Sequence, residues 1–256
     1  MAKYVEVKNN NGTITIDDTY ARLVKTRTIS ITAGTGVCPE ADYYYIKGYV
    51  SDQYIMGSYC VQEVNLNSNE VLVAIRAKKQ HANVAVLGGF ISSKKYLVTL
   101  LGNVANTNVY KSDFLIDVYG SVPSSGGTRS GLEVFNASGT KIFDSDFYCM
   151  DVIGNYSYFN KGIRSFVDEP DAKYLSGYSI DDCAVVINSC INKYARHPRA
   201  AYTSLINVLY GVVFGTSIHL EKRVNEYISF LYDGGNIVPH GFSHSSTGVI
   251  LSTNNI

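Results

Sequence analysis

Residues 4–17 read YVEVKNNNGTITID, which is two alternating runs on either side of an Asn-Gly turn. Alternation of apolar and polar residues is typical of a strand with one buried face. Asn-Gly between two such runs predicts a β-hairpin. We expect Gly12 to adopt a positive φ in its turn, because glycine has no Cβ to clash there.

The same pattern returns at residues 131–144, which read GLEVFNASGTKIFD. Laid over the first stretch at an offset of 127, it is identical at Glu6/Glu133, Val7/Val134, Asn9/Asn136, Gly12/Gly139, Thr13/Thr140 and Asp17/Asp144. The match indicates an internal duplication, with Gly139 at positive φ in a turn equivalent to that of Gly12. The alternative is coincidence, because unrelated hairpins share turn residues.

A polar stretch separates the two copies. Residues 123–130 read PSSGGTRS, which lacks apolar periodicity and is typical of a linker. The sequence therefore predicts a mainly β protein of two β-sandwich-like domains, each opened by a similar hairpin. The expected division is an N-terminal domain at 1–123, a linker at 124–130 and a C-terminal domain at 131–256.

Composition supports a β fold. The 256 residues include 21 Tyr and 22 Gly but no Trp and only 5 Pro, a bias toward strands and turns. Further strands are predicted at 26–31, 43–50, 70–77, 84–91, 96–101, 114–119, 156–159, 183–188, 202–209, 212–220 and 227–232. Residues 184–195 are the best helical candidate, but their β-branched side chains favour a strand.

Charge and hydropathy exclude some classes of function. The 22 Lys and Arg balance the 22 Asp and Glu, so no net field attracts a polyanion, and nucleic acid is not an expected partner. The sequence begins without an apolar signal-peptide region, and its longest apolar stretch, 205–214, is interrupted by Asn207 and Gly211. We expect neither a signal peptide nor membrane insertion.

No residue pattern predicts a catalytic or metal site. His240 and His244 are four residues apart, but Gly241 disfavours the helix that would bring them together. Three acidic groups, at 17–18, 144–146 and 181–182, lack the register of a calcium loop and are expected to close local turns. We expect no cofactor, no metal and no nucleophile, and therefore not an enzyme.

The cysteines show no pairing pattern. They are odd in number, widely spaced and without a C-x-x-C motif: Cys38, Cys60, Cys149, Cys183 and Cys190. This predicts free, buried or half-buried thiols rather than a disulfide framework or a zinc site.

Tyrosines are the remaining anomaly, and those expected at an interface are Tyr43, Tyr44, Tyr45, Tyr49, Tyr54 and Tyr59. Consecutive side chains of a strand point to opposite faces, so three tyrosines in a row cannot all face one core. Tyrosine suits interfaces because it gives a large contact area with few rotatable bonds. The alternative is that tyrosine merely fills strand positions. Neither half shows the Lys, Pro or strong charge that protects a sheet edge, which predicts a multimer.

The stretches at 123–145 and 4–20 together resemble segments of virion proteins of tailed bacteriophages, of the tail-tip and fibre-associated group. The resemblance implies a structural, non-enzymatic component of the distal tail (tail tip, baseplate or fibre attachment), made in the host bacterial cytoplasm. Its implied partners are other copies of itself, with a trimer implied by the resemblance alone, and neighbouring tail proteins. The alternatives are a receptor-binding module that contacts the host surface and, more remotely, a tail-associated hydrolase.

Overall fold

The chain folds into antiparallel strands, as shown by a computed structural model that describes most of the sequence. The described residues are 5–9, 12–16, 22–31, 59–102, 113–124, 131–136, 138–159, 172–175, 177–189, 192–199, 202–229, 240–243 and 245–253. The prediction of a mainly β, sandwich-like protein is confirmed.

The strands are β1 (Val5–Asn9), β2 (Gly12–Ile16), β3 (Val24–Ser30), β4 (Tyr59–Asn65), β5 (Glu70–Ala77), β6 (Val84–Ser92), β7 (Lys95–Gly102), β8 (Phe114–Gly120), β9 (Glu133–Phe135), β10 (Lys141–Asp144), β11 (Val152–Phe159), β12 (Ala172–Tyr174), β13 (Cys183–Ser189), β14 (Asn192–Arg199), β15 (Tyr202–Phe214), β16 (Ile218–Ser229), β17 (His240–Ser243) and β18 (Ser245–Ser252).

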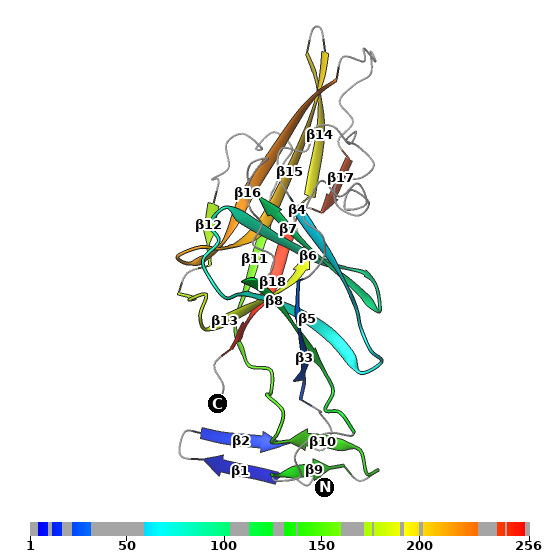
Figure 1. The fold of residues 1–256 in the computed structure, drawn as a ribbon, viewed down its shortest axis with the longest axis vertical. Coiled ribbons are helices and arrows are strands. Elements are labelled where there is room, and N and C mark those ends of the chain that lie inside the picture. The colour runs from blue at the N-terminus through cyan, green and yellow to red at the C-terminus, as the bar shows by residue number, and fades with distance from the viewer. Residues whose placement is uncertain are drawn as a thin grey trace.

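Two hairpin sheets and two large sheets make up the fold. β1 pairs with β2 and β9 pairs with β10, and both hairpins lie at the lower end of the molecule (Figure 1). The six-stranded sheet has the order β11-β18-β13-β5-β8-β3. The eight-stranded sheet has the order β12-β16-β15-β6-β7-β4, with β14 and β17 added beside β15. The long ends of β14, β15 and β16 project at the end opposite the hairpins (Figure 1).

The two large sheets share one apolar core. Rows of directly paired residues cross each sheet and point into this core: Ile29, Ile116, Ile75, Val185 and Ile250 in one, and Cys60, Leu100, Val86, Val212 and Leu220 in the other. The contacts that join the two sheets include a hydrogen bond and an aromatic pair. The Tyr96 hydroxyl donates a 2.7 Å hydrogen bond to the Ile187 carbonyl, and the Phe114 and Phe214 rings meet edge to face.

The strand order repeats itself across the centre of each sheet. From each centre outward, β5-β8-β3 corresponds to β13-β18-β11, and β6-β7-β4 corresponds to β15-β16-β12. The central pairs are antiparallel, Ile75 with Val185 and Val86 with Val212, as a local two-fold axis through each pair requires. The chain therefore has the topology of a dimer of two similar halves, and β14 and β17 are additions to the second half.

Each hairpin is joined to the large sheets by a short segment, and the two segments meet at the local two-fold axis that relates the halves. Leu23 and Met150 lie 127 residues apart, the offset that relates the hairpins, and the Met150 amide donates a 2.8 Å hydrogen bond to the Leu23 carbonyl. Both side chains pack on a small apolar cluster that includes Ala74 and Ala184, on the outer face of the six-stranded sheet. The duplication predicted from two hairpins thus extends over the whole strand order.

The predicted division into two domains at 124–130 needs correction, because each large sheet combines strands from both sides of that linker. Pairing β5 with β13 and β6 with β15 removes four exposed edges that two separate sandwiches would leave open. The repeated hairpins therefore mark the two halves of one sandwich and not the starts of two domains.

Several predicted strands are found and others are corrected. The strand predicted at 70–77 matches β5, and the region proposed as strand rather than helix forms β13 and β14. The strand predicted at 212–220 is wrong, because β15 continues through Gly211 to Phe214 and the turn lies at 215–217. Gly211 does not end a strand but permits close approach, since a Cβ there would lie 2.8 Å from that of Ala85. The strand predicted at 43–50 lies outside the described residues.

Candidate interaction surface

The second hairpin is organised by the side chain of Asn136. Its Oδ1 accepts hydrogen bonds from the amides of Ser138, at 3.1 Å, and Thr140, at 2.8 Å, and from the Ser138 hydroxyl at 2.7 Å. An asparagine side chain that binds the backbone two residues ahead is a standard way to fix a turn. Gly139 follows with φ of +80°, as predicted, and nothing lies within 4 Å of the position a Cβ would take.

The predicted equivalence of the two turns is wrong. Asn9 pairs directly with Gly12, so the first turn holds only two residues and Gly12 begins β2. In the second hairpin Phe135 pairs with Lys141, which leaves five residues in the turn. In the second hairpin the Asn136 side chain binds across this longer loop, and the pairing of β10 with β9 shifts between Lys141 and Phe143.

A buried lysine sits within the second hairpin. The Lys141 ammonium, 5% exposed, donates hydrogen bonds to Asp144, at 2.8 Å, and to Glu133. The hydrogen bonds to Asp144 and Glu133 raise the pKa of Lys141. Burial alone would raise the pKa of Asp144, but the hydrogen bonds from Lys141 and the Asp146 amide lower it. The last bond, at 2.9 Å, confirms that Asp144 closes a local turn. Ile14 stands at the position of Lys141 in the first hairpin, so this network belongs to the second half.

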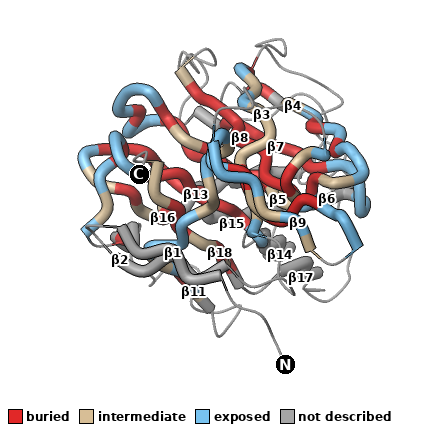
Figure 2. The backbone as a smooth tube through the Cα atoms, turned by 90° about the horizontal axis from the view of Figure 1, so that it is seen from below, coloured by how far each residue is buried: buried red, intermediate tan, exposed pale blue. Residues whose placement is uncertain are grey.

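Exposed large apolar side chains gather after the linker. Among the described residues, those that remain widely exposed include Leu132, Phe135, Tyr148, Val152 and Ile153, between 41% and 52% exposed. We call these five residues the apolar segment. They follow one another in sequence from the second hairpin to the start of β11, and Figure 2 shows the molecule from this hairpin end. Grouped exposed apolar residues mark interaction surfaces more often than scattered ones do.

Ionic groups occupy the outer face of the first half. Arg76 donates a 2.7 Å hydrogen bond to Asp117, which is 1% exposed and also accepts one from Thr28 at 2.5 Å. Arg27 binds both oxygens of Glu70 at 2.9 Å. Burial alone would raise the pKa of Glu70, but the hydrogen bonds from Arg27, the Asn67 amide and Thr26 lower it below its ordinary value.

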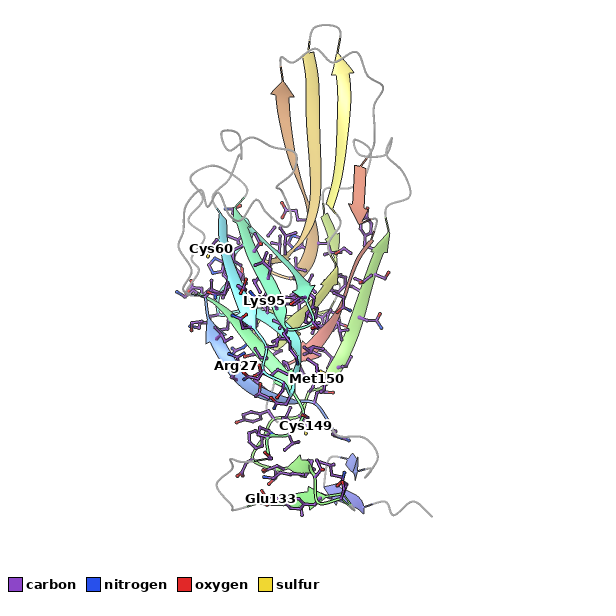
Figure 3. The ribbon with its side chains drawn as sticks, turned by 90° about the vertical axis from the view of Figure 1, so that its right-hand side faces the viewer. Arg27, Cys60, Lys95, Glu133, Cys149 and Met150 are labelled. Atoms are coloured by element: carbon purple, nitrogen blue, oxygen red, sulfur yellow. The ribbon has the colours of Figure 1, made fainter. Side chains whose placement is uncertain are left out.

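The second half carries apolar side chains at the positions of this first-half group. Thr28 pairs with Asp117 and Asp117 pairs with Ala74, whereas Val152 pairs with Leu251 and Leu251 pairs with Ala184. The corresponding trios are thus Thr28, Asp117 and Arg76 in the first half and Val152, Leu251 and Val186 in the second. Figure 3 shows Arg27 beside the first-half strands and Cys149 and Met150 in the neck, from which β11 rises on the right-hand margin.

The sheet edges differ in the same sense. β3 and β11 are the end strands of the six-stranded sheet. β3 reads VKTRTIS and carries Lys25 and Arg27, whereas β11 reads VIGNYSYF and has no charged residue. The expectation that neither half has protective charge is therefore wrong for the first half. Lys25 also lies over the Tyr148 ring, with its Nζ 5.0 Å from the centroid.

The interface tyrosines predicted from sequence lie almost entirely outside the described residues. Tyr43, Tyr44, Tyr45, Tyr49 and Tyr54 are there, and Tyr59 begins β4, where its backbone pairs with Leu101. Sequence analysis missed the apolar segment, although Leu132 and Phe135 stand within the second hairpin motif. The absence of charge from residues 152–159 is the signal that could have found the rest.

The other candidate residues are dispersed. His240 begins strand β17 and pairs with Tyr194, so the helix disfavoured in sequence does not form there, and His244 lies outside the described residues. Cys60 and Cys183 are buried free thiols and Cys149 is partly buried, as predicted for these three. Burial raises the pKa of both Cys149 and Cys183.

The described part of the chain holds no cluster of three or more His, Cys, Asp or Glu side chains arranged for a metal ion. It also contains no helix long and apolar enough to span a membrane. No family model, curated protein or solved structure matches this chain.

Proposed function

We propose that this chain is a structural, non-catalytic component of a bacteriophage virion, located in the distal tail, and that it works by binding neighbouring proteins. The observation that carries the assembly role is the apolar segment. The location in a phage tail rests on the resemblance of residues 4–20 and 123–145 to tail-tip and fibre-associated proteins.

The asymmetry between the halves supports an assembly role. A surface that served only to hold the fold together would not need apolar residues half exposed at Phe135 and Val152. At the position of Phe135 the first hairpin has Lys8, and at the position of Val152 the first half has Thr28. The second half thus has apolar side chains where the first half has polar ones, and apolar side chains favour burial against another protein.

The hairpin is built to present these residues in a fixed geometry. Ser145 accepts a 2.9 Å hydrogen bond from the Leu132 amide and returns one of 3.0 Å from its own amide to the Leu132 carbonyl. With the Asn136 turn and the Lys141 network, these bonds hold both strands of the hairpin. A preorganised surface loses less conformational entropy when it binds.

Purified particles test the location directly. Antibodies against the recombinant chain should label the tail end of particles from the phage that encodes it, in electron micrographs. Labelling confined to the lysate, with none on the particles, would contradict the proposal. If the same antibodies abolish infectivity while the tails stay intact, the result would instead indicate the receptor-binding alternative.

Matched apolar variants test the surface. The double variant Phe135→Ser, Val152→Ser should reduce incorporation into particles by about tenfold or more, which corresponds to about 1.4 kcal/mol of binding free energy. The control is Phe90→Ser, Val71→Ser, because these two side chains are exposed to a similar extent but lie outside the apolar segment. Equal incorporation of both variants would remove the apolar segment from the assembly role.

A further inference from the structure

β11 ends the six-stranded sheet, and among the described strands only β18 pairs with it. Its eight residues make it longer than the other end strands of the large sheets, which have seven residues in β3 and β4, four in β17 and three in β12. An end strand presents a row of backbone donors and acceptors, which is a template for pairing with another strand.

Charge separates β11 from β3 and β4, the end strands nearest to it in length. β3 carries Lys25 and Arg27, and β4 carries Glu63, whose carboxylate binds Lys95 at 2.9 Å. Charged residues on an edge oppose pairing with an identical edge, since like charges would meet. β11 has none, and its exposed side chains include Val152, Ile153, Asn155 and Ser157.

We propose that two copies of this chain pair through β11 in an antiparallel arrangement, which joins their six-stranded sheets into one continuous sheet. This contact rests on the proposed assembly role and names its partner. Antiparallel pairing about a two-fold axis brings the same uncharged strand from each copy together, so no like charges meet along it. The balanced charge of the whole chain, 22 positive against 22 negative residues, adds no long-range repulsion between copies.

The pairing also explains why apolar residues are exposed at the start of β11. With Asn155 on the axis, Ile153 of one copy lies opposite Ser157 of the other, so the exposed start of each β11 lies beside the end of its partner's β11. A two-fold contact of this kind uses the same surface on both copies and is closed, whereas a contact between two different edges could continue from copy to copy.

The first half supplies a matched control position. Asn155 pairs with Val249 and Ser30 pairs with Leu115, and Val249 and Leu115 correspond in the repeated strand order. Both Asn155 and Ser30 are exposed. Lysine at either site places one charge on an end strand of the same sheet, but only Asn155→Lys places two like charges in the proposed contact.

Sedimentation of the full-length chain at micromolar concentrations tests the proposal. The unmodified chain and Ser30→Lys should sediment as two-copy particles, and Asn155→Lys should raise the dissociation constant by about a hundredfold. Ser157→Lys serves as a second β11 variant if Asn155→Lys melts at a lower temperature than Ser30→Lys. A one-copy unmodified chain, a trimer unaffected by the β11 variants, or equal weakening by Ser30→Lys would each overturn the proposal.

This result is independent of the test for the virion role. A β11 dimer from a chain that is absent from particles would keep the contact and reject the proposed function. A chain that labels the tail but sediments as a single copy would keep the function and reject the contact.

Discussion

The two halves of this molecule share one strand order but differ in the chemistry of their outer surface. The first half places Thr28, Asp117 and Arg76 where the second has Val152, Leu251 and Val186. Both sets occupy the same register next to a small residue, Ala74 or Ala184. The six-stranded sheet therefore accepts either an ionic group or an apolar group at the same position on its outer face. It follows that the rows of paired apolar residues in the core, and not this outer face, specify the topology.

The difference also separates stability from interaction. A buried ion pair contributes little net free energy, because desolvation offsets the attraction, but it leaves a surface that does not favour association. The apolar trio needs no partners of its own, yet Val152 remains half exposed. We infer that the first half keeps a surface suited to solvent, while the second keeps one suited to another protein.

The largest effect is expected from separating the halves. Residues 1–127 and 128–256, produced as two chains, should each lack a cooperative thermal transition. In the first chain β5 loses its partner β13 and β6 loses its partner β15, and the second chain loses the same two pairings. Mixing them should restore the transition in circular dichroism. Two independent transitions from isolated monomeric halves would instead support separate domains and contradict the shared sheets.

The next effect concerns the ionic group. Asp117→Ala should lower the free energy of unfolding by about 3 kcal/mol, because it leaves the Arg76 charge and the Thr28 hydroxyl without this partner. The triple variant Thr28→Val, Arg76→Val, Asp117→Leu copies the second half and should stay within about 1 kcal/mol of the unmodified chain. Urea unfolding compares the two. A triple variant as unstable as Asp117→Ala would show that the halves are not interchangeable there.

The strand pattern and the duplication could be predicted from sequence, but the pairing of the halves could not. The offset is 127 in the hairpins but 110 between Ile75 and Val185 and 134 between Ile116 and Ile250. Loops and bulges of different length cause this drift, so a fixed offset detects only the hairpins. Which strands meet at the sheet centres depends on contacts between distant residues, and local periodicity carries no information about them.

The exposed surface was still harder to predict. Val152 and Leu251 are similar in hydrophobicity, and the pairing alone decides that one is half exposed while the other is 0% exposed. Sequence reasoning missed β4, β12, β17 and β18. β4 contains Glu63 and β18 contains several serines, which weaken the alternating pattern, and β12 and β17 have only three and four residues.

A smaller effect is expected from pH, because the stability that the first-half carboxylate Glu70 contributes depends on its charge. The pKa of Glu70 is lowered in the folded state, so its contribution to stability is complete above its ordinary value of 4.5 and is lost as pH falls through the folded value. Glu70→Gln should therefore be less stable than the unmodified chain at neutral pH, and the difference should vanish in acid. Urea unfolding from neutral to acidic pH measures it, with exposed Glu63→Gln as control. A difference independent of pH would assign the loss to packing rather than to the charge.

The smallest effect should be local to the second hairpin. Asn136→Ala removes the acceptor of two amide hydrogen bonds in the five-residue turn, whereas Asn9→Ala changes a residue whose turn is closed by backbone pairing with Gly12. A lost hydrogen bond of this kind costs about 1 kcal/mol. Hydrogen exchange should therefore accelerate at the Ser138 and Thr140 amides by about fivefold in Asn136→Ala, since about 1 kcal/mol of local opening free energy corresponds to that factor. The midpoint of global unfolding should not move, because the hairpin forms its own two-stranded sheet outside the large ones. Equal acceleration of exchange at the first turn in Asn9→Ala would mean that both turns depend on their asparagine side chains. The two hairpins would then fix their turns in the same way, in spite of their different registers.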